Sequence, residues 1–137
     1  MEAVLQSLTS GFPILLLHFA VTLAILIAGV AVYLWVTPFH EIALIRAGNK
    51  AAAVTLSGAI VGLAVPLSFC LAGSVNVFDL LVWGAVIVAL QVVAYRVIDL
   101  LLRDIGDRIE NDEIGPAILL VGVKLAVAAI TSAAVAG

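Results

Sequence analysis

Residues 12–36 read FPILLLHFAVTLAILIAGVAVYLWV, a run of 25 residues without a charged side chain. A helix needs about 20 mostly apolar residues to cross the hydrocarbon core of a bilayer. Three further stretches have a similar character, at residues 51–73, 79–102 and 115–136. The sequence therefore predicts an all-α integral membrane bundle of four transmembrane helices. The leader before residue 12 holds Glu2 and no basic residue, so we expect the first span to stay in place rather than be cleaved as a signal peptide.

The composition supports this class and excludes others. Of the 137 residues, 65% are hydrophobic and 11% are charged. A soluble domain of this length must expose a large share of its residues to water, so we expect one membrane domain over residues 1–137 with the lipid bilayer as its surroundings. A net charge of −3 with scattered signs argues against nucleic-acid binding. A single cysteine, Cys70, allows neither an internal disulfide nor a thiolate metal cluster.

Basic residues predict the orientation of the chain. Four of the six, Arg46, Lys50, Arg103 and Arg108, lie in the two polar connections, here called the elbows, at residues 37–50 and 103–114. Arg96 lies just inside the helix end before the second elbow, and the other connection and both ends have no basic residue. Loops rich in Lys and Arg stay in the cytoplasm, so we expect both elbows inside and both termini outside. Tyr33, Trp35 and Tyr95 fit as aromatic anchors near the cytoplasmic ends of the spans, and Trp83 fits near an outer end.

The two halves of the chain resemble each other. An offset of 64 residues aligns Ala53-x-x-Leu56-x-Gly58-x-x-x-Gly62 with Ala117-x-x-Leu120-x-Gly122-x-x-x-Ala126. This predicts a tandem repeat of two helical hairpins, roughly residues 12–73 and 79–136, in the same orientation. The alternative is that two helices rich in Ala and Gly align by composition alone.

Small residues and one proline predict how the helices pack. Gly58, Gly62, Gly122 and Ala126 would let helix backbones approach closely. Pro66 removes an amide, which frees the carbonyl of Gly62 and kinks the helix. The freed carbonyl either lines a cavity or accepts from a nearby hydroxyl.

Each elbow has its own expected structure. In the first, Thr37 suits a helix N-cap, Pro38 the first helical position and Gly48 the stop, with Asn49 capping the next span. The second holds five carboxylates and two arginines between residues 103 and 113. Their spacing does not fit a calcium loop, so we expect a solvated, partly self-neutralised loop.

Polar groups inside the spans are the candidate pathway residues. Lys124 lies nine residues beyond Gly115, about 14 Å into the bilayer at the helical rise. No carboxylate is expected at that depth, and Gln91 is the nearest polar partner. Lys124 is either a binding charge that attracts anions or a tolerated lysine that snorkels. His18 is the third candidate, although a lone helical histidine is more often a satisfied polar group, and no metal site is expected.

Arg96, Asp99, Arg103 and Asp107 recur at helical spacing near the cytoplasmic end of the third span. Neighbours of opposite sign in such a series neutralise one another, which favours a structural charge ladder. The alternative is a cytoplasmic vestibule for an ion pathway. No phosphate-binding loop, zinc-protease motif or nucleophile elbow is present, so neither an enzyme nor a cofactor is expected.

A set of motifs is similar to a known family. They are Thr37-Pro38-x-x-Glu41-x-x-Leu44-Ile45-x-x-Gly48-Asn49-x-Ala51-Ala52, then Leu56-Ser57-Gly58-x-x-x-Gly62-x-x-x-Pro66-Leu67-Ser68, and Asp79-x-x-x-Trp83-Gly84. The chain resembles the bacterial inner-membrane family of domain of unknown function 350. The resemblance implies a four-helix inner-membrane protein of unestablished role, often encoded near envelope-stress proteins and peptide–polyamine ligases. Lys124 stands where we expect a small or apolar residue in this family.

Two functions are expected from these features. The first is a small channel-like or transporter-like protein that works as a homo-oligomer, with Lys124, Gln91 and His18 on its pathway. The second is a scaffold or anchoring subunit of an envelope-maintenance complex, with envelope-stress proteins as partners and the elbows as its working surface.

Overall fold

The computed structural model describes residues 1–37 and 40–137. These residues form six helices and no strand: α1 (Glu2–Val36), α2 (Glu41–Arg46), α3 (Lys50–Gly73), α4 (Val77–Leu101), α5 (Arg103–Glu110) and α6 (Ile114–Ala136). Among the described residues, α1, α3, α4 and α6 are long and apolar enough to cross a membrane. The predicted all-α class is thus confirmed, and α1 begins ten residues before the expected residue 12.

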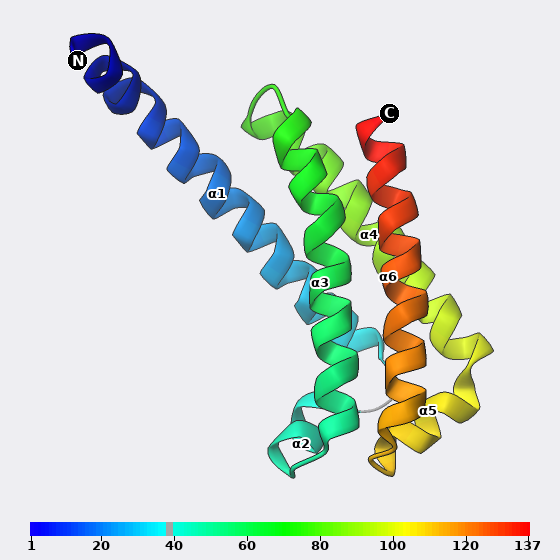
Figure 1. Ribbon diagram of the computed structural model, residues 1–137. Coiled ribbons are helices and arrows are strands. Elements are labelled where there is room, and N and C mark those ends of the chain that lie inside the picture. The colour runs from blue at the N-terminus through cyan, green and yellow to red at the C-terminus, as the bar shows by residue number, and fades with distance from the viewer. Residues whose placement is uncertain (38–39) are drawn as a thin grey trace.

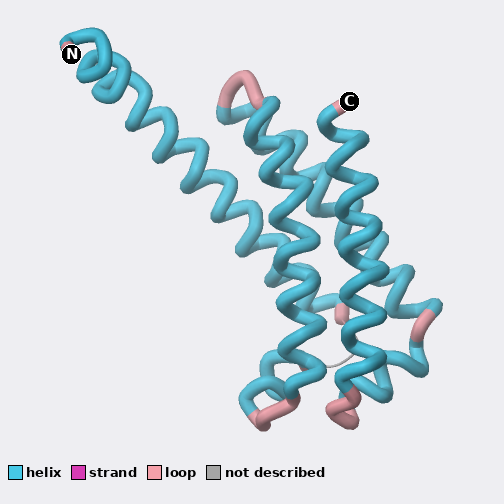
Figure 2. The backbone as a smooth tube through the Cα atoms, viewed as in Figure 1, coloured by secondary structure: helices cyan, strands magenta, loops and turns pink. Residues whose placement is uncertain are grey.

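The bundle has two distinct ends (Figure 1). Both termini and the turn between α3 and α4 lie at one end, here called the terminal end, and α2 and α5 lie at the other, the elbow end. Helix α1 leans away from the others toward the terminal end, and only Gly29 and Tyr33 of it are buried. The tube view in Figure 2 shows that α1 comes closer to the other helices toward the elbow end. The core therefore lies nearer the elbows than the termini.

Helices that follow each other in sequence are not the main packing partners. Helix α3 packs most extensively on α6, and α1 packs most extensively on α4. The core that they share includes Tyr33 from α1, Leu63 from α3, Tyr95 from α4 and Leu120 from α6, all 1% exposed or less. The two-hairpin arrangement and the tandem repeat stay predictions.

The first elbow corrects one detail of the sequence analysis. A short helix, α2, is present, and Gly48 ends it with a φ of +96°. Thr37 does not cap this helix, because it ends α1 and its hydroxyl donates to the carbonyl of Tyr33 at 2.6 Å. The expected position of Pro38 lies outside the described residues.

The second elbow is not the loop that we expected. Residues 103–110 form helix α5, in which Ile105 and Ile109 are one turn apart and Ile109 is fully buried. The charged residues cover the rest of this amphipathic helix, so burial of one apolar edge holds it on the bundle. The partial self-neutralisation is present as an ion pair of 3.0 Å between Arg108 and Glu113.

The elbows are tied to each other by capping side chains. Asn49 caps α3 as predicted, since its Oδ1 accepts from Ala52 N at 2.8 Å. Its Nδ2 donates to the carbonyl of Ile109 at 2.9 Å. Asp112 Oδ1 accepts from Lys50 N at 2.8 Å and from Ala51 N at 3.0 Å. Two helix termini are therefore satisfied across the elbow end.

Only half of the predicted small-residue contacts exist within this chain. A Cβ added to Gly58 would lie 2.6 Å from Val121 Cγ2, and one added to Gly62 would overlap the Tyr95 hydroxyl. Gly122 and Ala126 are exposed, and nothing lies within 4 Å of a Cβ on Gly122. This second pair therefore makes no close contact with the described residues of the bundle, and a contact with another subunit stays a prediction.

These contacts predict different outcomes for two similar substitutions. Gly58→Ala should lower the free energy of unfolding by about 1–3 kcal/mol, because the branched Val121 cannot move aside without cost. Gly122→Ala is the matched control and should leave stability unchanged or raise it by up to about 1 kcal/mol through helix propensity. Unfolding in mixed micelles, followed by circular dichroism, measures both. Equal effects would contradict the packing of α3 on α6 described here.

Candidate functional site

A buried ion pair joins α4 and α6 in the core of the bundle. Lys124 Nζ lies 3.1 Å from Asp99 Oδ1, and the two side chains are 0% and 5% exposed. The expectation that no carboxylate lies at the depth of Lys124 is wrong. Helix α4 stops short of the elbow end and α5 covers the remaining distance (Figure 1). Asp99 therefore lies deeper in the bundle than its sequence position, at the end of the third hydrophobic stretch, indicates.

Tyr33 extends the ion pair to α1 and α2. Lys124 Nζ donates to the Tyr33 hydroxyl at 2.7 Å, and this hydroxyl donates to Glu41 Oε1 at 3.1 Å. The Tyr95 ring stands edge-on to that of Tyr33, with 6.1 Å between centroids. Tyr33 and Tyr95 are 1% and 0% exposed, so their expected role as interfacial anchors is wrong. They form the walls around the ammonium instead.

The site holds more negative than positive groups. Its hydrogen-bonded groups are two carboxyls, Asp99 and Glu41, and one ammonium, Lys124. The partly buried Arg96 lines a cavity together with Asp99 and is the next positive charge. Among the described residues, Asp99 Oδ2 and Glu41 Oε2 are buried without a hydrogen-bond partner. Burial raises the pKa of Glu41 to about 7, with the charge of Asp99 acting in the same direction and Lys124 opposing it. The arrangement can therefore hold one proton near neutral pH.

A second polar group lies next to this site, toward the terminal end. Gln91 is fully buried, and its Nε2 donates to the Gly62 carbonyl at 3.1 Å and to the Tyr95 hydroxyl at 3.3 Å. Its Oε1 accepts from Thr131 Oγ1 at 2.8 Å. The carbonyl freed by Pro66 is thus satisfied by an amide rather than by a hydroxyl. Gln91 contacts Tyr95 and not Lys124, which differs from the expected pairing.

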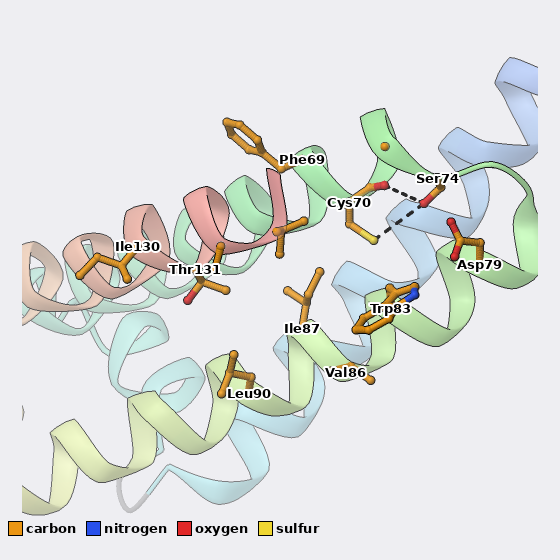
Figure 3. Close-up of a pocket in the computed structure, with 13 residues that line it drawn as sticks. Phe69, Cys70, Ser74, Asp79, Trp83, Val86, Ile87, Leu90, Ile130 and Thr131 are labelled. Atoms are coloured by element: carbon orange, nitrogen blue, oxygen red, sulfur yellow. Dashed lines mark hydrogen bonds between the residues drawn. The ribbon is translucent and has the colours of Figure 1, made fainter. Parts of the chain in front are cut away.

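Cavities lie on both sides of these polar groups. One of about 300 Å³ lies near the elbow end, between α4 and α5, and Asp99 is in its lining. The other, of about 600 Å³, lies between α3, α4 and α6 near the terminal end, and Thr131 is in its lining (Figure 3). Tyr95 and Gln91 occupy the core between the two.

The predicted charge ladder is divided by a helix end. Helix α4 ends at Leu101 and Arg103 begins α5, so the four residues do not follow one helix. Asp99 pairs with Lys124 instead of an arginine. Arg96, Asp99, Arg103 and Asp107 all line the cavity near the elbow end. Their common feature is this cavity, and its use as a vestibule for an ion pathway stays a prediction.

His18 is not part of the site. It is partly exposed on the half of α1 that leans away from the bundle, and its Nδ1 lies 2.8 Å from the carbonyl of Ile14. Of the three candidate pathway residues, Lys124 and Gln91 are thus neighbours in the core and His18 lies apart. In residues 1–37 and 40–137, no group of three or more His, Cys, Asp or Glu side chains is arranged to hold a metal ion.

Residues 7–135 match the family model described as Domain of Unknown Function (DUF350). The chain belongs to this family. Two relatives, from Escherichia coli strain K12 and from Escherichia coli O157:H7, both carry the name UPF0719 inner membrane protein YjfL. Each is 28% identical to this DUF350 chain over 94 residues, which cover 69% of the chain and 71% of the relative. No solved structure matches the chain.

Substitutions in the ion pair should change the unfolding free energy of this DUF350 member by predictable amounts. Lys124→Met should cost about 3–5 kcal/mol of unfolding free energy, because it leaves Asp99 buried without a counter-charge. Adding Asp99→Leu should recover part of this loss, with a coupling of about 1–3 kcal/mol in a double-mutant cycle. The exposed Lys50 provides the control, since Lys50→Met should change stability by less than about 0.5 kcal/mol. Additive effects of the two core substitutions would show that the side chains are not paired.

Proposed function

We propose that this DUF350 protein resides in the bacterial inner membrane with its elbow end in the cytoplasm and both termini outside. The name of the Escherichia coli relatives and the four long apolar helices support the location. Arg46, Lys50, Arg103 and Arg108 all lie at the elbow end, which supports the orientation.

We propose further that the protein is transporter-like and that the Lys124–Asp99–Tyr33–Glu41 site carries a proton. The observation behind this proposal is the second carboxyl of a buried site that borders one cavity directly and is separated from the other by Gln91 and Tyr95. With Glu41 protonated, the charges of Lys124 and Asp99 balance each other, and loss of that proton adds one negative charge to these groups. A charge of this kind rebinds a proton or a cation and repels an anion, which reverses the selectivity expected from Lys124 alone.

The packed layer between the cavities favours a transporter over an open channel. Gln91, Tyr95 and Leu63 are fully buried. The nitrogen of the Gln91 amide donates to the Gly62 carbonyl, and its oxygen accepts from the Thr131 hydroxyl. A proton that reaches Asp99 from the cytoplasmic cavity therefore needs a rearrangement to reach the outer one. Alternating exposure of the site to the two cavities would provide it.

We propose that the working unit is a homo-oligomer. Every residue from 2 to 17 is exposed, and α1 diverges from α3 at the terminal end (Figure 1). A second copy would cover this side of the bundle and complete the outer half of a pathway.

We also propose that the chain is a tandem repeat of two hairpins. Two residues with positive φ, Gly48 and Asp112, are 64 residues apart, the same offset as in the sequence alignment. The N-cap residues of α3 and α6, Asn49 and Glu113, have this offset too. The main helix pairs, α1 with α4 and α3 with α6, join corresponding elements of the two halves.

Proton movement through purified protein in liposomes tests the transport proposal. With a pH-sensitive dye inside and an inward-directed proton driving force from a potassium diffusion potential, we expect faster acidification than in empty liposomes. Asp99→Asn and Glu41→Gln should reduce the rate to that of empty liposomes, because each removes a carboxyl that takes up the proton. Asp104→Asn, an exposed carboxyl of α5, should behave as the unchanged protein.

Circular dichroism and elution volume establish that each variant is folded before the flux is compared. Wild-type acidification equal to that of empty liposomes, or full activity in folded Asp99→Asn, would contradict the proposal.

The alternative is a scaffold for an envelope-maintenance complex, and the tied elbows favour it. Asn49 and Asp112 tie the start of α3 to the end of α5 and to the turn before α6, which joins these elements in one surface. Purification from membranes should then recover a stoichiometric partner that is lost when residues 103–110 are scrambled. Recovery of no such partner would contradict the scaffold.

A further inference from the structure

The cavity near the terminal end has the features of a ligand site that the proton-carrying site does not use. Its volume of about 600 Å³ lies within the range of small-molecule pockets, about 300–1,000 Å³. Its walls come from three helices, with Phe69 and Cys70 on α3, Ile87 and Leu90 on α4, and Ile130 on α6 (Figure 3). Apolar walls of this kind accept the hydrocarbon body of a ligand.

One end of the cavity carries a negative charge. Asp79 lies there beside Ser74 and Trp83, while Thr131 and Ile130 line the opposite part (Figure 3). Asp79 Oδ2 accepts from Val75 N at 3.2 Å, and within the described residues Oδ1 has no hydrogen bond. This leaves a carboxylate oxygen available to a ligand.

The chain provides no lysine or arginine to neutralise this carboxylate. All six Lys and Arg residues lie elsewhere, five of them in α2, α5 or the elbow-side ends of α3 and α4, and the sixth, Lys124, in the core with Asp99. Trp83 is one helical turn from Asp79 and lines the same cavity. The face of an indole attracts an ammonium or phosphonium group, which adds to the attraction of the carboxylate.

We propose that this cavity binds amphipathic organic cations, with Asp79 and Trp83 contacting the charged group and the apolar walls contacting its hydrocarbon part. Charge distinguishes this occupant from a lipid acyl chain, which would fill the walls and leave Asp79 unpaired. The inference does not depend on proton movement, and its test measures binding alone.

Tetraphenylphosphonium and tetraphenylborate are the matched probes, because they share shape and apolar surface and differ in the sign of the charge. Equilibrium dialysis of the purified protein in lipid nanodiscs, corrected with empty nanodiscs, should give saturable binding of the phosphonium and none of the borate. Asp79→Asn should weaken phosphonium binding at least about tenfold, the loss of about 1.4 kcal/mol. Asp104→Asn is the control and should bind as the unchanged protein does.

Two further measurements locate the probe and guard against a folding defect. Cys70 is the single cysteine and lines the cavity, so the phosphonium should slow its alkylation by a maleimide. Trp83→Leu leaves the hydrogen bond from Val75 N to Asp79 Oδ2 in place and should also weaken binding. Equal binding of the two probes, an unchanged affinity in folded Asp79→Asn and Trp83→Leu, or no saturable binding would overturn the proposal.

Discussion

The contact between Lys124 and Asp99 is the interaction on which the arrangement of the long helices depends. A charged group in the core of an apolar bundle is costly unless a counter-charge and hydrogen bonds surround it. Here the ammonium reaches Asp99 of α4 and the Tyr33 hydroxyl of α1, and Tyr33 in turn reaches Glu41 of α2. The position of Lys124 on α6 thereby restricts where three other helices can lie.

Gln91 performs a related task for α3, which contributes no side chain to the ion pair. The carbonyl that Pro66 leaves free on Gly62 is satisfied by Gln91, and Gly62 also makes room for the Tyr95 hydroxyl. Tyr95 contacts Gln91 and packs against Tyr33, so the amide and the ionic site are adjacent layers. Side chains fill both layers. The ionic layer borders the cavity near the elbow end through Asp99, and the Gln91 layer borders the cavity near the terminal end through Thr131.

Length and hydropathy alone predicted four long helices whose ends lie within about two residues of the observed ones, because the thickness of a bilayer restricts the length of a spanning helix. The exception is the start of α1, which lies ten residues before the expected residue 12. Lys124 and Gln91 were also found from the sequence, since polar groups in such helices are rare. The partner Asp99 was missed because its depth depends on where α4 ends. Ile105 and Ile109, which hold α5 against the bundle, were the sequence feature that could have indicated this end. The sequence did not indicate that Tyr33 and Glu41 belong to the site. The tilt of α1 and the fold of the first elbow bring these side chains inward, and the spacing of hydrophobic residues does not predict either feature. Among the described residues, the small-residue face with Gly122 has no close neighbour within the chain, and a small residue does not indicate which neighbour its face meets.

We propose that the buried site holds a proton on Glu41 near neutral pH. Infrared difference spectroscopy tests the protonation of Glu41 most directly. Burial raises the pKa of Glu41 to about 7. The infrared band of the protonated Glu41 carboxyl should therefore grow as the pH is lowered through that value. The band should be lost in Glu41→Gln and retained in Glu110→Gln, which alters an exposed carboxyl of α5. A spectrum without a carboxyl that titrates near neutral pH, or a band that persists in folded Glu41→Gln, would contradict the account.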